Sequence, residues 1–224
     1  MDAVIDKLLL PSCCGCQSTS RLVRMPHLSF SMCAECSAGF ELKLRQEPLL
    51  DLKLRYACTD YQGPVKAMLS RAKDEAYCSQ YFALSSAFVA AVTPLLADLL
   101  KDGKVVVCCV PSSRQRRLRG WYLPEAIARN VAQNTGIRFR PLLRRKRNVA
   151  KQSSLDAVQR RMNLHQCFAS RKLWRRQNTR DTAVLIIDDV STSGASLVEA
   201  ARCLGLMNFR QVIAISLAIA PLRC

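Results

Sequence analysis

The chain has 224 residues, of which 50% are hydrophobic and 23% are charged. This composition supports a folded core and excludes disordered, collagen-like and coiled-coil proteins. The net charge of +17 is concentrated in residues 111–180, which hold 19 of the 34 Lys and Arg but only two of the 17 Asp and Glu. A localised field of this sign favours an anionic partner, such as nucleic acid, a phosphorylated small molecule or an anionic membrane surface.

The N-terminal residues do not have the pattern of a secretory signal. Asp2 and Asp6 stand where a basic region would lie, and the apolar run at 8–10 is short. We therefore expect a cytoplasmic protein whose thiols are reduced or bind metal. Residues 76–97 carry no charge and are long enough to cross a membrane. Polar residues and a proline interrupt them, so we expect a buried helix and no membrane span.

The first 50 residues are loop-like and contain two closely spaced cysteine pairs. Cys13 and Cys16 form one C-x2-C pair, and Cys33 and Cys36 form the second after sixteen intervening residues. This spacing predicts a closed structural zinc site with four thiolate ligands. Cys14 could replace Cys13, although the spacing would then be C-x-C. A module this short buries little surface, so the metal would supply its folding free energy.

From about residue 55, apolar runs alternate with amphipathic segments. The sequence predicts a strand at 55–61, a turn at Gly63-Pro64 and a helix over 65–72, followed by a long buried helix over 79–100. Further strands are expected at 104–110, 183–188 and 211–219, and further helices at 124–135 and 195–206. Alternation of this kind predicts an α/β fold with a parallel sheet.

One predicted strand ends in two adjacent acids. Asp188 and Asp189 follow the apolar run 184–187, and a loop of small residues then opens a helix: Thr192, Ser193, Gly194, Ala195 and Ser196. Ligands of parallel α/β sheets bind at the carboxyl ends of the strands, and a helix N-terminus offers free N–H groups to a phosphate. The two carboxylates can accept hydrogen bonds from sugar hydroxyls and contact a hydrated Mg²⁺. A helix cap would explain one of these polar residues but not the set.

The segment VLIIDDVSTSGAS at 184–196 resembles the phosphoribosyl-pyrophosphate signature of type I phosphoribosyltransferases. Ser191 stands where an aliphatic residue is usual. The resemblance implies that Asp188 and Asp189 bind the ribose hydroxyls and stabilise positive charge at the anomeric carbon. It also implies that residues 192–196 hold the 5′-phosphate and that Mg²⁺ accompanies the substrate.

Further matches extend over essentially the whole chain and favour one branch of these proteins. The sequence resembles the ComF (ComFC) family, whose members join an N-terminal zinc ribbon to a phosphoribosyltransferase-like domain. The matching positions are Tyr61-Gln62-Gly63, Lys73, Val110-Pro111, Arg119-Gly120, Gln152, Arg160, Asn163 and Phe168. The chain departs from the family at Trp121-Tyr122-Leu123, where Phe-Asn-Gln is usual, and at Val149, where Thr is usual. The resemblance implies a zinc-ribbon module with four cysteine ligands at 1–50 and a parallel-sheet type I phosphoribosyltransferase-like domain at 51–224.

The basic segment offers more cations than one small ligand needs. Arginine binds phosphate oxygens bidentately, so Arg114 and Arg119, together with Lys73, are candidate ligands of the pyrophosphate group. The remaining cations, including Arg144 to Arg147, favour a polyanion, and the alternative is a solvated basic face. Three aromatic residues could stack on bases of single-stranded DNA or pack in the core: Trp121, Tyr122 and Trp174.

Two functions are compatible with these patterns. One is a Mg²⁺-dependent transferase that binds phosphoribosyl pyrophosphate, and the alternative is a non-catalytic competence protein that uses the same fold to bind single-stranded DNA through 111–180. Family membership would place either function in DNA uptake or the use of imported DNA, with competence-machinery proteins as candidate partners. No motif identifies the acceptor of the phosphoribosyl group.

Overall fold

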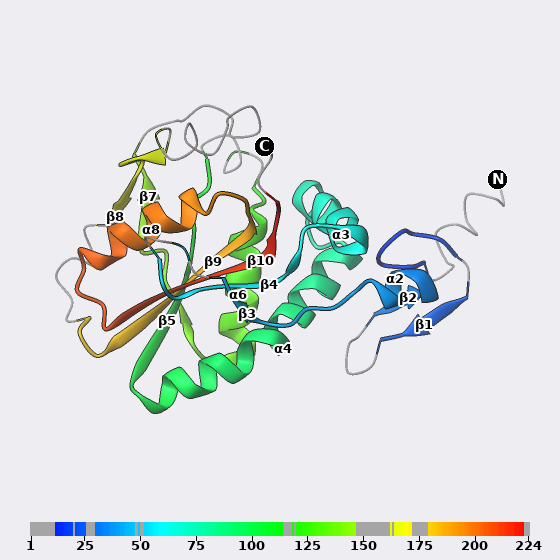
Figure 1. The fold of residues 1–224 in the computed structure, drawn as a ribbon, viewed down its shortest axis with the longest axis horizontal. Coiled ribbons are helices and arrows are strands. Elements are labelled where there is room, and N and C mark those ends of the chain that lie inside the picture. Colours follow the sequence, from blue (N-terminus) through cyan, green and yellow to red (C-terminus); the bar gives the residue numbers. More distant parts are fainter. Residues whose placement is uncertain are drawn as a thin grey trace. The chain divides into compact units, whose positions relative to one another are not determined.

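The structure is a computed structural model that describes residues 12–19, 21–25, 30–47, 49, 52–113, 118, 120–146, 162, 164–171 and 179–221 (Figure 1). The chain forms two compact units. One comprises Met1–Glu41 and Gln62–Ala87, and the other comprises Leu42–Tyr61 and Phe88–Cys224. The division does not fall at residue 50, because strand β3 (Arg45–Gln46) pairs with β4 (Arg55–Asp60) of the second unit.

The first unit contains the cysteine pairs and helix α3. Strands β1 (Leu22–Arg24) and β2 (Ser31–Cys33) pair antiparallel, and the short helix α2 (Ala34–Ala38) follows directly. Helix α3 (Gly63–Asp74) has Pro near its start, where the missing N–H is tolerated. Its buried face consists of Val65, Met68, Leu69 and Ala72, which recur at helical spacing.

The second unit is built on a six-stranded sheet, which confirms the predicted α/β class. Its strands lie in the order β3, β4, β10 (Gln211–Ile219), β9 (Thr182–Ser191), β5 (Lys104–Cys109) and β6 (Arg138–Phe139). All neighbouring pairs are parallel except β3 with β4. Strands β9 and β10 are almost continuously buried, because helices cover both faces of a parallel sheet.

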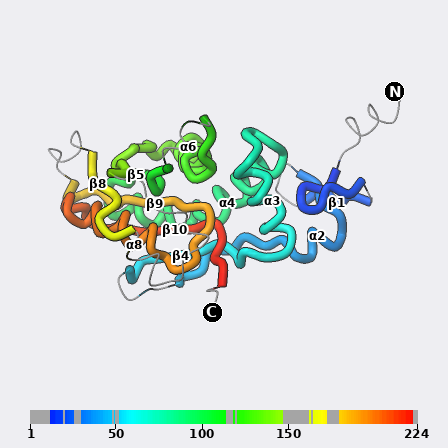
Figure 2. Tube along the Cα trace, turned by 90° about the horizontal axis from the view of Figure 1, so that it is seen from above, coloured from blue at the N-terminus to red at the C-terminus, as the bar shows by residue number. Residues whose placement is uncertain are grey.

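From the neighbouring strands β5 and β9, the chain continues toward opposite edges of the sheet. Helix α6 (Leu123–Thr135) lies between β5 and β6 in the chain, and helix α8 (Ala195–Gly205) lies between β9 and β10. Figure 2 shows these two helices on opposite faces of the sheet. The carboxyl ends of β5 and β9 therefore form a topological switch point, which is where ligands of open α/β sheets bind.

Helix α4 (Ser79–Lys101) occupies the uncharged segment that the sequence singles out. By length and composition it could cross a membrane, and 44% of its most apolar window is buried. Its side chains Phe88, Val92 and Leu96 are almost inaccessible to solvent. Core helices of water-soluble proteins pass the same test of length and composition, so the finding is weak evidence for a membrane span.

A separate two-stranded ribbon packs near α8. Strands β7 (Leu143–Arg145) and β8 (Phe168–Ser170) pair antiparallel, with Arg144 opposite Ala169. Leu143 and Phe168 belong to the same buried cluster as Leu197 and Leu204 of α8. Strands of two or three residues have no readable periodicity, so neither this ribbon nor β3 and β6 are predicted from the sequence.

Candidate functional site

The four predicted metal ligands converge in the first unit. The Sγ atoms of Cys13, Cys16, Cys33 and Cys36 lie within 4.8 Å of one another, and those of Cys16 and Cys33 are 3.7 Å apart. Sulfur atoms at about 2.3 Å from a tetrahedral zinc are about 3.8 Å from each other. This four-cysteine cluster therefore has the dimensions of a site that could bind a metal such as zinc. Cys14 is not among the four converging sulfurs, so the C-x2-C spacing of the first pair is confirmed.

The backbone around the four-cysteine cluster stabilises negative charge on sulfur. Burial raises the pKa of Cys13, but N–H groups of Cys33, Cys16 and Gly15 more than offset it and lower the pKa to about 6. The N–H of Cys33 donates to Cys13 Sγ at 3.2 Å. Burial raises the pKa of Cys36 far above its ordinary value, and the neighbouring thiols raise it further. A metal cation would provide the positive charge that four thiolates need.

Gly15 allows the two cysteine turns to approach each other. A Cβ atom at this position would lie 2.7 Å from Cys36 Sγ and 3.1 Å from a side-chain carbon of Pro64. Only glycine therefore fits between the second cysteine pair and the start of α3. This close packing explains why the α3 segment belongs to the same compact unit as the cysteines.

In the second unit, the acid pair lies within the last residues of β9. Asp188 is aligned with Ser216 of β10, and both acids are buried, with 8% and 6% of their surfaces exposed. Asp188 Oδ1 accepts the N–H of Asp189 at 3.0 Å, and Asp189 Oδ1 accepts the N–H of Val190 at 2.7 Å. These hydrogen bonds orient both carboxylates. Strand β9 ends at Ser191 and is therefore longer than the predicted strand at 183–188.

The end of β5 lies beside the acid pair. The N–H of Val110 donates to the carbonyl oxygen of Ile187 at 3.1 Å, so the chain leaves β5 beside the residue that precedes Asp188, and the buried Ser112 follows two residues later. Burial raises the pKa of Cys109 well above its ordinary value, and the nearby carboxylates raise it further. This cysteine therefore remains a thiol at neutral pH and is a poor nucleophile.

The loop after β9 presents the N-terminus of α8. Its N-cap is Gly194, which has the left-handed backbone φ of 72° and provides no side-chain cap. The N-cap residue therefore provides no side-chain hydrogen bond to the first N–H groups of α8. The positive end of the helix dipole lies at these N–H groups. Ser193 and Ala195 are buried, whereas Thr192 and Ser196 are half-buried. Because the sequence predicts that this region binds a phosphate, we call residues 191–196, which include the last residue of β9, the phosphate loop.

One residue of this region is not predicted from the sequence to belong to the site. Arg55, at the start of β4, is only 3% exposed and donates from Nη2 to Ser191 Oγ at 3.0 Å. Its guanidinium carbon lies 3.8 Å from where a Cβ atom on Gly194 would be. The only sequence signal is an arginine at the start of a predicted strand, together with the unusual serine at 191.

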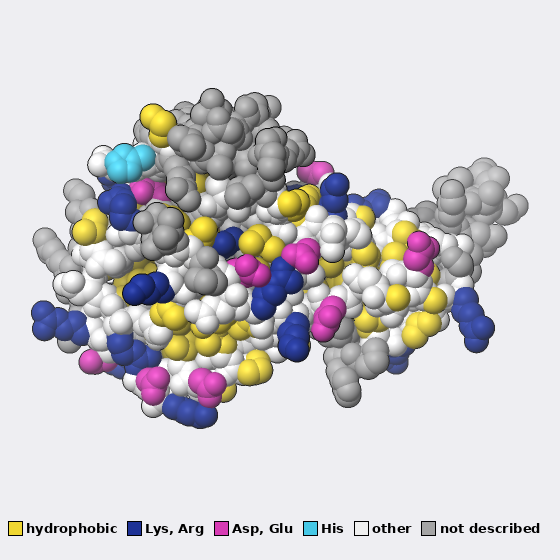
Figure 3. Space-filling view, in the orientation of Figure 1, with side chains coloured by type: hydrophobic (Ala, Val, Ile, Leu, Met, Phe, Trp, Pro, Cys, Tyr) yellow, Lys and Arg dark blue, Asp and Glu magenta, His cyan; other side chains and the backbone are white. Residues whose placement is uncertain are grey.

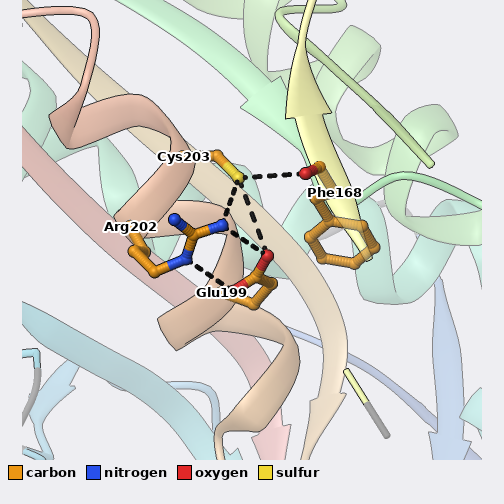
Figure 4. Close-up of polar contacts among 4 residues, drawn as sticks. All are labelled: Phe168, Glu199, Arg202 and Cys203. Atoms are coloured by element: carbon orange, nitrogen blue, oxygen red, sulfur yellow. Dashed lines mark hydrogen bonds and ion pairs between the residues drawn. The ribbon is translucent and has the colours of Figure 1, made fainter. Parts of the chain in front are cut away.

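Polar contacts of the buried Glu199 with the exposed Arg202, and of Cys203 with Phe168, connect α8 to the β7–β8 ribbon (Figure 4). Glu199 is 5% exposed and receives hydrogen bonds at 2.8 and 2.9 Å from the guanidinium of Arg202. Cys203 Sγ donates to the carbonyl oxygen of Phe168 at 3.4 Å. Burial alone would raise the pKa of Glu199, but Arg202 and the N–H groups of Phe168 and Gln166 lower it below its ordinary value.

Glu199→Gln is expected to destabilise the protein by about 2 kcal/mol at pH 7, because it removes the charge from a buried, multiply bonded carboxylate. The folded-state pKa is depressed, so the stabilisation is present above the unfolded pKa of about 4.3 and is lost as the pH falls through the folded value. Urea unfolding at pH 7 and at pH 3 measures both effects. Glu125→Gln, in an exposed ion pair with Arg129, is the control and should cost less than about 0.5 kcal/mol. Equal losses in the two variants would contradict the assignment.

The remaining predicted ligands of the pyrophosphate group are Lys73, Arg114 and Arg119. Lys73 lies on α3 of the first unit, and Arg114 and Arg119 lie outside the described residues, as does Trp174. Trp121 and Tyr122 are half-buried directly before α6. Searches of protein-family models and of curated proteins found no match to the chain. The functional assignment therefore depends on the residues and their geometry.

Proposed function

We propose that this chain is a ComF-family protein that binds Mg²⁺–phosphoribosyl pyrophosphate and acts in the cytoplasm in the uptake or use of imported DNA. The observation that carries the proposal is the acid pair Asp188-Asp189 followed by the phosphate loop, at the switch point between β5 and β9. The type I phosphoribosyltransferase-like fold and the zinc-ribbon identity of the first module belong to the same proposal.

The donor set suits this ligand. Asp188 and Asp189 provide carboxylate oxygens, which accept from ribose hydroxyls and are the ligand type that Mg²⁺ prefers. The hydroxyls of Thr192, Ser193 and Ser196 and the N–H groups at the start of α8 are donors for a phosphate monoester. The left-handed Gly194 lets the backbone turn toward such a group.

The chemistry would be substitution at the anomeric carbon. The bond from that carbon to pyrophosphate breaks, and pyrophosphate leaves with the electron pair. The nucleophile then bonds to the same carbon and loses its proton. Asp188 and Asp189 would hold the ribose and stabilise the positive charge that develops on the ring. Bound Mg²⁺ would offset the charge of the leaving pyrophosphate.

The Asp188→Asn/Asp189→Asn variant tests this site. We expect it to bind Mg²⁺–phosphoribosyl pyrophosphate at least about a hundredfold more weakly than wild type, because two charge-assisted hydrogen-bond acceptors are lost. Isothermal titration calorimetry measures the difference. Asp98→Asn/Asp102→Asn, at the exposed end of α4, makes the same change of charge and should bind normally. Equal affinities in the two variants, or no binding by folded wild type, would refute the proposal.

Single-stranded DNA binding is the second candidate, and the β7–β8 ribbon favours it. On the face drawn in Figure 3, the described Lys and Arg side chains are dispersed among other residues. In the ribbon, however, Arg144 of β7 and Lys146 directly after β7 are both exposed, and Arg171 is exposed directly after β8. Arg145 has a structural role, since its guanidinium lies 5.2 Å from the centre of the Phe168 ring and it donates to the carbonyl of Pro111.

Arg144→Glu/Lys146→Glu should therefore weaken binding of single-stranded DNA and reduce its salt dependence by about one to two released counterions. Fluorescence anisotropy with a labelled oligonucleotide, measured across a salt series, gives both quantities. Lys101→Glu/Lys104→Glu reverses the same number of exposed charges elsewhere. An identical salt slope in the ribbon variant and wild type would exclude the ribbon as a DNA-binding surface.

A further inference from the structure

Arg55 brings a buried positive charge to the phosphate loop. Only 3% of its surface is exposed, and Nη1 donates to the backbone carbonyl oxygen of Glu47 at 3.4 Å. Among the residues that the structure describes, no carboxylate lies within ion-pair distance of it, and its Nε has no hydrogen-bond partner. Burial lowers the pKa of this guanidinium, and the more distant Glu47 carboxylate partly offsets the effect. A buried cation without an anionic partner is costly unless another charge compensates it.

The geometry connects this charge to the loop. Nη2 donates to Ser191 Oγ, the last residue of β9, and the guanidinium carbon lies beside Gly194, the N-cap of α8. Leu49 packs against the same glycine, where an added Cβ atom would lie 2.3 Å from Leu49 Cδ1. Arg55 therefore lies beside the turn from which α8 begins.

The hydrogen bond from Arg55 depends on the hydroxyl group of Ser191. An aliphatic residue at this position could not accept the hydrogen bond, and the guanidinium would then lose its only side-chain partner among the described residues. A serine in place of the usual aliphatic residue and an arginine beneath it therefore act as one unit. The unit adds a full positive charge where the helix N-terminus contributes only a partial one.

We propose that Arg55, acting through Ser191, is the buried counter-charge and positioning residue of the phosphate loop, and that it selects a doubly charged phosphate monoester. This inference rests on the proposed function and specifies the charge of the group that the loop receives. Arg55 does not touch the ligand: it holds Ser191 and the adjacent turn, and its charge acts through the loop. Compensation of this charge by the bound phosphate would offset the cost of burying the cation.

The test uses ribose 5-phosphate, whose single phosphate reports on the loop. Ser191→Val restores an aliphatic residue, and Arg55→Met/Ser191→Val replaces both polar partners, which limits the loss of stability. We expect the double variant to bind ribose 5-phosphate about tenfold more weakly than wild type, with a smaller salt dependence. Ser191→Val alone should show part of the loss, and Arg55→Lys should retain more affinity than the double variant because it keeps the charge.

The outcomes separate this inference from the proposed function. Calorimetry measures affinity, and thermal unfolding verifies that each variant is folded. Wild-type affinity and salt dependence in the double variant would overturn the role of Arg55 while the proposed function stands. If the double variant does not fold, wild-type affinity in Ser191→Val would overturn the role of Arg55. Failure of wild type to bind both ribose 5-phosphate and Mg²⁺–phosphoribosyl pyrophosphate would refute the proposed function itself.

Discussion

Freshly purified, reduced protein is expected to contain one zinc ion per chain, and Cys33→Ser is expected to contain none. Zinc binding by structural sites of this kind is worth about 10–16 kcal/mol at neutral pH, so its loss should unfold the module of residues 12–41. Metal analysis of the purified protein measures the first effect. Loss of the amide protection of this module in hydrogen exchange measures the second.

Cys14→Ala is the matched control for the zinc prediction. Cys14 is adjacent to Cys13 and is also buried, but its sulfur is not part of the four-cysteine cluster, and burial raises its pKa. This variant should therefore retain one zinc per chain. Absence of zinc in wild type would refute the metal site, and loss of zinc in Cys14→Ala would mean that the first cysteine pair binds through a different sulfur.

Gly194→Ala is expected to weaken binding of Mg²⁺–phosphoribosyl pyrophosphate by about tenfold or more while the protein remains folded. Alanine in the left-handed conformation costs about 1 kcal/mol or more. Its Cβ would also lie 2.3 Å from Leu49 Cδ1, so the Leu49 side chain or the turn must shift. A turn that relaxes away from the left-handed φ of 72° would change the alignment of the N–H groups of α8. Calorimetry on the variant measures the affinity.

Gly205→Ala, at the other end of the same helix, is the control. A Cβ atom at Gly205 would meet nothing within 4 Å, and its φ is not in the left-handed region. Alanine is also the better helix former, so this variant should bind normally and be at least as stable as wild type. Equal affinity of the two alanine variants would show that the Gly194 turn does not shape the binding site.

The long elements could be predicted because their signals are local. Continuous apolar runs at 104–110 and 211–219 become β5 and β10, and the run at 183–188 becomes the central part of β9. Helix α8 begins at residue 195, as predicted, because Gly194 ends the preceding turn. Gly194 has a left-handed backbone conformation, which favours glycine. The two cysteine pairs are equally local signals, since the two cysteines of each pair are only three positions apart in the sequence.

The features of the site that the sequence does not predict depend on contacts between residues far apart in the chain. Arg55 and Ser191 are 136 residues apart, so their hydrogen bond has no sequence signature beyond the unusual serine. The alignment of β5 beside β9, which brings Val110 next to Ile187, follows from the strand order and not from either segment alone. Glu199 looks like an ordinary polar residue of a helix surface, yet the β7–β8 ribbon covers it.

Hydrogen exchange of folded, zinc-loaded wild type, with and without Mg²⁺–phosphoribosyl pyrophosphate, shows whether a phosphate binds at the start of α8. We expect slower exchange on ligand addition at the N–H groups of Ser193, Ala195 and Ser196, because a bound phosphate would occupy the start of α8. We expect little change at residues 211–219, which are already protected within the sheet. Unchanged exchange across 188–196 at saturating ligand would contradict the phosphate site.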